Sequence, residues 1–185
     1  AAGQTATIAY NSAEEELFKG ANVSIGSSLS YNGTNTATLD GVSVTETKIK
    51  MPSTEESTAT DANAITFTVT PKTGITFTPT KVSLVATRCG TDGGKMNITW
   101  VDTENSSITL ATGVTPDRDN KTPNATKYEY NLTSNNAAST TGECGIKINL
   151  YGVGNSKSYA LANIIIEGTL SGSVSAVATY TITAQ

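Results

Sequence analysis

Three charged side chains and a cysteine lie around one tight turn in VATRCGTDGGKMNITW, residues 85–100 of this 185-residue chain. Arg88 and Cys89 end one strand-like run, Asp92 lies within the glycine-rich turn, and Lys95 begins the next run. An arginine can hold a carboxylate through two parallel hydrogen bonds, and aspartate and lysine can bind hydroxyl groups. Glycine and aspartate are also the residues that a hairpin turn requires. The segment alone therefore predicts a hairpin, and the hypothesis of a site depends on which segments lie beside it.

The composition argues against several classes of function. The chain has no histidine, which removes the usual general base and the commonest metal ligand. Charged residues make up 15% of the chain and give a formal net charge of −4, whereas nucleic-acid binding requires a concentrated basic surface. No apolar run approaches the roughly 20 residues of a membrane helix. We therefore expect a monomeric, non-enzymatic protein without a cofactor that neither binds nucleic acid nor inserts into membranes.

Short alternating segments dominate the chain and predict strands. In AITFTVTP (64–71), apolar side chains share one face and threonines share the other, which is typical of a strand buried on one side. Similar segments, with turn residues between them, recur at 6–10, 42–51, 81–89, 95–101, 107–111, 127–133, 143–151 and 159–170. The pattern predicts an all-β fold, namely an antiparallel β-sandwich of the jelly-roll type or a related Greek key.

The remaining segments set the expected boundaries. SAEEELFKG predicts at most one short helix near residues 12–19, because a serine can cap it, glutamates suit its first turn and Gly20 can end it. Residues 21–36 and 53–63 are polar and predict loops, the first with at most one short strand. We expect one sandwich module over residues 1–172, followed at 173–185 by a linker and the first strand of a further module.

Alternation also predicts which aromatic side chains face the core. Trp100 shares a face with apolar neighbours, so it is expected in the core rather than as a platform for stacking sugars. Tyr128 and Tyr130 share a face with a leucine and are expected in the core as well. Tyr151 has the opposite parity to its apolar neighbours and is expected on the surface.

Strand direction predicts which loops meet. If the strands from residue 81 onward alternate in direction, the loops at 90–94, 112–126 and 152–157 share one end of the fold. Binding residues on sandwiches often lie on loops held by such a rigid scaffold. We therefore expect a site for a polar ligand at that end. Its candidate ligand-binding residues are Arg88, Asp92, Lys95, Asp117, Arg118, Tyr151, Asn155, Lys157 and Tyr159.

Two other interpretations of these loops stay open. The turn and the PDRDN segment could be solvated loops that bind nothing. Alternatively, Asp117 and Asp119 could supply oxygen ligands for calcium, although the chain has no EF-hand spacing.

The pairing of the two cysteines is open too. Strand counting places Cys89 near the loop-bearing end and Cys144 near the opposite end. A six-residue strand spans roughly 20 Å, whereas the Cα atoms of a disulfide lie within about 7 Å. Geometry therefore argues against a bond, while export to an oxidising compartment would favour one.

Three segments resemble β-sandwich modules of secreted bacterial polysaccharide-degrading enzymes, such as pectate-lyase-like multidomain proteins. They are FTPTKVSLVATRCGTDGGKMNITW, TPDRDN and GECGIKINLYGVGNSKSYALANIIIEGTL, and the similarity spans about residues 60–172. The resemblance implies a secreted or cell-surface, non-catalytic module that holds the other domains of its polypeptide near a plant-type polysaccharide. No motif transfers a ligand residue by its position.

The sequence therefore predicts a carbohydrate-binding module that targets an attached enzyme to a polysaccharide, with a pectic glycan as one candidate. For an acidic glycan the four basic candidate residues should matter most. For a neutral glycan the two tyrosines should matter more, together with Asp92 and Asn155. The first alternative is a structural spacer or adhesion module without a small ligand. The second is a lyase or hydrolase that uses carboxylates.

Overall fold

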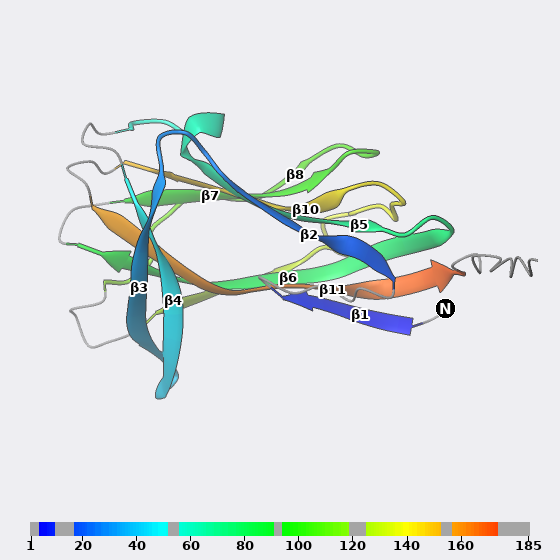
Figure 1. Ribbon diagram of the computed structural model, residues 1–185, viewed down its shortest axis with the longest axis horizontal. Coiled ribbons are helices and arrows are strands. Elements are labelled where there is room, and N and C mark those ends of the chain that lie inside the picture. The colour runs from blue at the N-terminus through cyan, green and yellow to red at the C-terminus, as the bar shows by residue number, and fades with distance from the viewer. Residues whose placement is uncertain are drawn as a thin grey trace, which may run out of the picture.

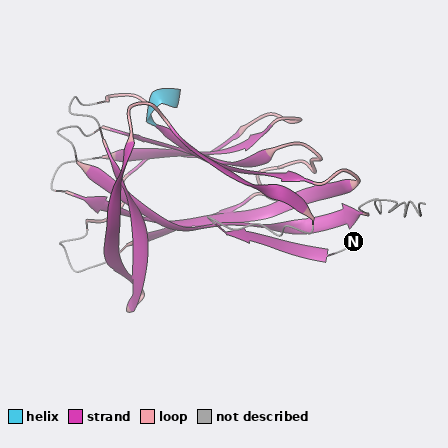
Figure 2. Ribbon diagram, in the orientation of Figure 1, coloured by secondary structure: helices cyan, strands magenta, loops and turns pink. Residues whose placement is uncertain are grey.

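Two antiparallel β-sheets pack face to face in the computed structural model of the chain (Figures 1 and 2). The structure describes residues 4–9, 17–51, 56–90, 94–118, 125–152 and 157–173. The six-stranded sheet has the order β3-β4-β11-β6-β9, with β1 also paired to β11, and the five-stranded sheet has the order β2-β5-β10-β7-β8. The strands are β1 (Gln4–Ala9), β2 (Phe18–Ile25), β3 (Ser30–Leu39), β4 (Val42–Lys50), β5 (Ala64–Pro71), β6 (Ile75–Cys89), β7 (Lys95–Asp102), β8 (Ile108–Val114), β9 (Thr126–Asn131), β10 (Cys144–Tyr151) and β11 (Ser158–Gly172).

The connectivity is that of a jelly roll. The strands β4, β11, β6 and β9 lie in one sheet, and β5, β10, β7 and β8 lie in the other in matching order. Except for the β7–β8 hairpin, each step along the chain from β4 to β11 crosses from one sheet to the other. This nesting of two Greek keys is the jelly-roll arrangement. The predicted fold class is therefore confirmed.

Alternating side chains fill the space between the sheets, as the sequence predicts. Ile65, Phe67 and Val69 on β5 are all buried, and so is Trp100 on β7, which is only 1% exposed. Tyr128 and Tyr130 on β9 are half-buried and pack against the same core. The core position of Trp100 is confirmed, while the two tyrosines line its margin because β9 is the edge strand of its sheet.

The predicted helix near residues 12–19 is wrong where the structure describes it, because β2 begins at Phe18. The aromatic ring of Phe18 is buried and meets that of Phe77 edge to face, with centroids 5.5 Å apart. Gly20, which the sequence suggested as a helix stop, has φ 112° at an irregularity in the pairing of β2 with β5. Burial of Phe18 between the sheets outweighs the local helical pattern. Residues 12–16 lie outside the described residues.

The predicted loop at residues 21–36 is also wrong, because most of it belongs to β2 and β3. Both strands lie at sheet edges and carry mainly exposed or half-buried side chains. A strand that buries little apolar surface shows no apolar alternation in its sequence. Its backbone is nevertheless paired, β2 with β5 and β3 with β4. The described part of the predicted loop at 53–63 does connect strands and contains one 3-10 turn, Asp61–Asn63.

The β3–β4 hairpin extends beyond the six-stranded sheet on the side away from the five-stranded sheet (Figure 1). Its turn uses Asp40 and Gly41 at φ 50° and 82°, the positive values that a tight hairpin requires. Ala37, with Leu39 and Val44 beside it, packs on a small cluster formed by Val85, Ala125 and Ala162. The hairpin is therefore anchored against the outer face of that sheet.

The two cysteines do not form a disulfide with each other. Cys144 begins β10 and pairs with Asp102, whereas Cys89 ends β6 and pairs with Ser158. These positions lie at opposite ends of the sandwich, as strand counting suggests, so the open question is answered against a disulfide. Burial raises the pKa of the Cys144 thiol, which keeps it protonated and inert.

The chain's predicted division at residue 172 coincides with the end of β11 at Gly172. The expected linker and further strand are at residues 173–185, of which 174–185 lie outside the described residues, so this division of the chain stays a prediction. Among the residues that the structure describes, no helix is long and apolar enough to cross a membrane.

Candidate functional site

Five connections between strands begin and end at one end of the sandwich, which we call the loop end. They are residues 26–29, 51–63, 90–94, 115–125 and 152–157, and the strand ends that they join lie toward the left in Figure 1. The pairing places them together, because Tyr151 lies opposite Lys95 while Ser158 lies opposite both Cys89 and Lys50. The predicted alternation of strand direction is therefore confirmed. The connections at 26–29 and 51–63 are the ones that sequence reasoning did not place at this end.

Arg88 and Arg118 lie next to each other at the loop end. An isolated parallel bridge joins their backbones. The backbone N–H of Arg88 donates to the carbonyl of Asp117 at 2.8 Å, and the N–H of Asp117 donates to Oγ1 of Thr126 at 2.9 Å. Both arginines are half-buried, whereas Asp117 is exposed. The fixed backbone thus holds two guanidinium-bearing residues beside one carboxylate.

Lys95 and Lys157 belong to the same region. A Cβ atom at Gly90 would lie 3.2 Å from Cδ of Lys157, and one at Gly152 would lie 3.6 Å from Cγ of Lys95. The aliphatic part of each lysine therefore runs along a glycine of a neighbouring connection. The backbone carbonyl of Lys157 accepts a hydrogen bond of 2.7 Å from the N–H of Met51, which ties in the connection at 51–63.

Tyr159 lies in the core beneath the loop end. Its side chain is fully buried, and its hydroxyl donates to the backbone carbonyls of Lys95 at 3.2 Å and Tyr151 at 3.1 Å. Burial raises the pKa of Tyr159, and the charge of nearby Arg88 opposes that shift. A side chain in this position joins strands and presents no ring for stacking on a sugar.

Tyr151 is buried too, which corrects the expectation that it lies on the surface. It is 9% exposed, and its hydroxyl donates to Oδ1 of Asn97 at 2.8 Å. The same oxygen accepts the N–H of Gly113 at 2.9 Å. The outward parity was read correctly, but β10 is the central strand of its sheet and neighbouring segments cover its outer face.

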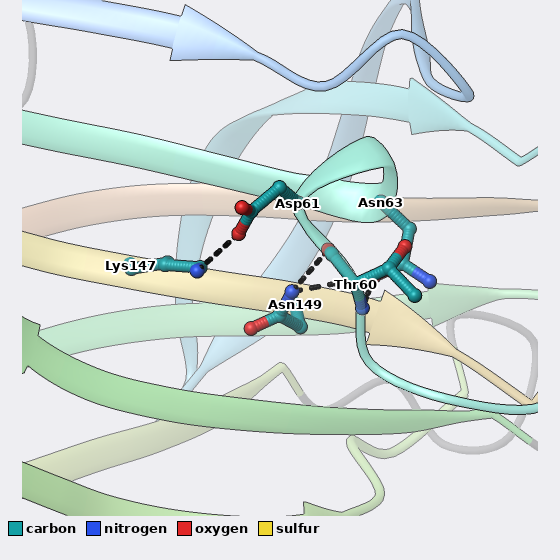
Figure 3. A network of polar contacts seen from close by, with 5 residues as sticks. All are labelled: Thr60, Asp61, Asn63, Lys147 and Asn149. Atoms are coloured by element: carbon teal, nitrogen blue, oxygen red, sulfur yellow. Dashed lines mark hydrogen bonds and ion pairs between the residues drawn. The ribbon is translucent and has the colours of Figure 1, made fainter.

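One of these covering segments is the turn at residues 60–63 (Figure 3). Nδ2 of Asn149 donates to the carbonyl of Thr60 at 2.6 Å and to Oδ1 of Asn63 at 3.3 Å. Nζ of Lys147 pairs with the carboxylate of Asp61, and this contact lowers the pKa of Asp61. The outward-facing polar residues of β10 therefore bind protein rather than a ligand. The alternation of Lys147, Asn149 and Tyr151 was the only sequence signal for this contact.

The described candidate residues at the loop end carry more positive than negative charge, namely Arg88, Lys95, Arg118 and Lys157 against one carboxylate of the predicted set, Asp117. The connection at 51–63 adds the carboxylates of Glu56 and Asp61, of which Asp61 pairs with Lys147. The candidates Asp92 and Asn155 lie outside the described residues, as does Asp119 of the calcium hypothesis. Within the described ranges, no group of three or more cysteine, aspartate or glutamate side chains is arranged to hold a metal ion.

No family model matches the chain, and no curated protein matches it either. The comparison with solved structures does find similar folds. An exo-beta-agarase structure is 13% identical over 78% of this chain, with a TM-score of 0.46. This chain spans only 24% of the length of that agarase chain.

Carbohydrate-binding modules are also among the similar structures. The family 11 module from Clostridium thermocellum is 10% identical, with 90% of this chain and 96% of that one covered and a TM-score of 0.41. The CBM22-1 xylan-binding domain from Paenibacillus barcinonensis is 10% identical, with the same coverage and a TM-score of 0.38. At identities of 10–13% and TM-scores of 0.38–0.46, these similarities carry no argument about what this chain does.

Proposed function

We propose that this domain is a non-catalytic module that binds an acidic polysaccharide through its loop end. The observation that carries the proposal is the burial of Tyr151 and Tyr159, which are the two aromatic candidates at that end. A site for neutral sugar would use such rings for stacking. With both rings buried, the described candidates that remain are basic side chains and one carboxylate.

The basic side chains suit a ligand with carboxylate groups. A guanidinium group can hold a carboxylate through two parallel hydrogen bonds, and lysine adds a point charge. The chain as a whole has a net charge of −4, so the cations of the loop end are a local feature rather than part of a basic surface. A uronate polysaccharide, of which pectin is the plant example, carries a carboxylate on each acidic sugar and fits this local charge.

The proposed role is to raise the concentration of attached domains at their glycan. A module that keeps an enzyme near its polymer makes each later encounter effectively intramolecular. This role requires a secreted or cell-surface parent chain and no chemistry by the module itself. It also requires only modest affinity, because several modules or repeated sites on the polymer can act together.

The experiment is affinity electrophoresis of the domain in gels that contain polygalacturonate or a neutral glucan. We expect retardation by polygalacturonate that weakens as salt rises, because the contacts are ionic. Arg118→Ala should weaken binding by about ten-fold, the value of one charge-assisted hydrogen bond. Its backbone bridge to Arg88 needs no side chain, so the variant should fold.

Lys72→Ala is the matched control, because it removes one positive charge from the β5–β6 turn at the opposite end of the sandwich. It should leave the retardation unchanged. Absence of binding to any acidic glycan would favour the spacer or adhesion alternative. Equal losses in Arg118→Ala and Lys72→Ala would mean that net charge, not the loop end, causes the retardation. Release of shorter sugars by the isolated domain would revive the enzyme alternative.

A further inference from the structure

A hollow lies on the outer face of the six-stranded sheet, beside the β3–β4 hairpin. Its volume is about 380 Å³, within the range of roughly 300–1,000 Å³ that small-molecule sites occupy. It is lined by Leu39 and Asp40 from the hairpin and by side chains of β6, β9 and β11. The residues of the loop end take no part in it.

The hollow is held in shape by contacts on both sides. The backbone N–H of Ala125 donates to the carbonyl of Thr38 at 2.9 Å, which ties the hairpin to the start of β9. The small cluster of Ala37, Val85 and Ala162 fixes the hairpin against the sheet. A ligand would therefore meet a preformed surface and would not have to order the hairpin first.

Charges in the hollow compensate one another. Nζ of Lys81 lies 2.6 Å from Glu167 and 3.5 Å from Glu129, and Nζ of Lys127 lies 3.2 Å from Glu129. With Asp40, the lining has two ammonium groups against three carboxylates. Because carboxylates outnumber ammonium groups in this lining, it should repel a polyanion, whereas the basic side chains of the loop end should attract one. The paired groups are between about a third and a half exposed, so each keeps hydrogen-bonding capacity toward the hollow.

The backbone also bends to place a polar residue in the lining. The pairing of β11 with β6 is irregular between Ala162 and Ile165, where Asn163 adopts φ 48°. Such bulges re-aim side chains and occur often beside functional sites. Asn163 is exposed and lines the hollow together with apolar Val85 and Ile165. Positive φ at a residue other than glycine is uncommon, so the bulge is a specific feature of this strand.

We propose that this hollow binds a neutral, polyhydroxylated ligand, the chemical class of neutral saccharides. A sugar hydroxyl both donates and accepts, so it can bridge an ammonium group and the carboxylate beside it. The Asn163 amide offers a further donor and acceptor, and the apolar part of the lining receives the C–H face of the sugar ring. The inference uses residues other than those of the proposed function and does not rest on it.

The test is titration of the ¹⁵N-labelled domain, followed by NMR, with cellotetraose, xylotetraose and mannotetraose, and with tetragalacturonate as the charged contrast. At about 10 mM ligand we expect at least one neutral tetrasaccharide to shift the amides at 81–85, 127–129 and 163–167. Because that ligand carries no charge, its affinity should not change with salt. Asn163→Gly keeps the backbone free to adopt positive φ and should weaken binding about five-fold, the loss of one neutral hydrogen bond.

Asn136→Gly is the matched control, because Asn136 is also exposed, has φ 59° and lies in the β9–β10 connection away from the hollow. It should leave binding unchanged. The proposal is overturned if no neutral tetrasaccharide shifts these amides, if only tetragalacturonate does so, or if Asn163→Gly binds as well as Asn136→Gly. Loss of polygalacturonate binding in Arg118→Ala has no bearing on these outcomes, so the two proposals fail separately.

Discussion

Replacing Tyr159 by phenylalanine separates a structural tyrosine from a ligand-binding one. The change removes one hydroxyl that donates to two backbone carbonyls at 3.1 and 3.2 Å, beneath the loop end. Each such bond contributes roughly 0.5–1.5 kcal/mol, and the two carbonyls lose a donor at a buried and a part-buried position. Tyr159→Phe should therefore lower the free energy of unfolding by about 2 kcal/mol.

Urea denaturation measures this loss. With a slope of about 2 kcal/mol per molar urea, the unfolding midpoint should fall by about 1 M. Tyr31→Phe is the control, because Tyr31 is 54% exposed, and it should change the free energy of unfolding by less than about 0.5 kcal/mol. A Tyr159→Phe protein that unfolds with the native midpoint but no longer binds polygalacturonate would refute the reasoning, since the hydroxyl would then serve the ligand.

Tyr159 should also make the free energy of unfolding depend on pH in the alkaline range. Burial raises the pKa of Tyr159 above its ordinary value of 10.0, so the folded protein keeps a proton that the unfolded chain loses. The stability that this provides is complete below pH 10 and is lost as the pH rises above it, by at most about 1.4 kcal/mol per pH unit. Tyr159→Phe should reduce this slope. Burial also raises the pKa of Tyr130 to about 12, so part of the slope should persist in the variant.

Three further changes test the fold. Trp100→Ala should lower the free energy of unfolding by about 3–5 kcal/mol, measured by thermal or urea unfolding, because the ring is buried. Glycan binding should stay intact. Lost binding with native stability would show instead that the ring stacks on the sugar. Glu104→Gln should weaken the loss of thermal stability between pH 4.5 and 2. Hydrogen bonds from threonines lower the pKa of Glu104 to about 2, so its stabilising effect is present above pH 4.5 and lost toward pH 2; an unchanged acid profile would contradict this. Gly145→Ala should disrupt the β5–β10 pairing and reduce the soluble yield, because the new Cβ would lie 2.0 Å from the carbonyl oxygen of Phe67. In the control Gly90→Ala the new Cβ would meet only the flexible side chain of a lysine, so this variant should fold. Equal soluble yields of the two variants would refute the argument.

Most strands with one buried face could be predicted, because apolar residues then alternate with polar residues along the sequence. This holds for β5 and β7, whose inward residues are the core seen in the structure. It fails for β2 and β3, since edge strands owe their pairing to neighbours rather than to their own apolar pattern. Gly20 shows the same limit. The local sequence pattern predicted that it ends a helix, whereas the contact of Phe18 with the core, which the local pattern does not contain, favours a strand.

The position of the loop end could be predicted, but the side chains that reach its surface could not. Direction alternates along a jelly roll, so counting strands brought Arg88, Arg118 and Lys157 together correctly. Parity gives only the face of the sheet, and it cannot tell whether solvent or another segment covers that face. The turn at 60–63 covers Asn149 on the outer face of β10, and Tyr151, which shares that face, is buried as well.

The buried Tyr159 also ties together the strands on which the loop end is built. The Tyr159 hydroxyl on β11 joins the carbonyls of Lys95 on β7 and Tyr151 on β10, so one side chain connects the two sheets where the loops begin. Basic side chains on such a fixed base lose less entropy on binding than they would on a mobile loop. At the hollow the proposed ligand carries no charge, so its binding should not respond to salt. Raising ionic strength should therefore weaken binding of an acidic glycan at the loop end and leave binding of a neutral one at the hollow unchanged.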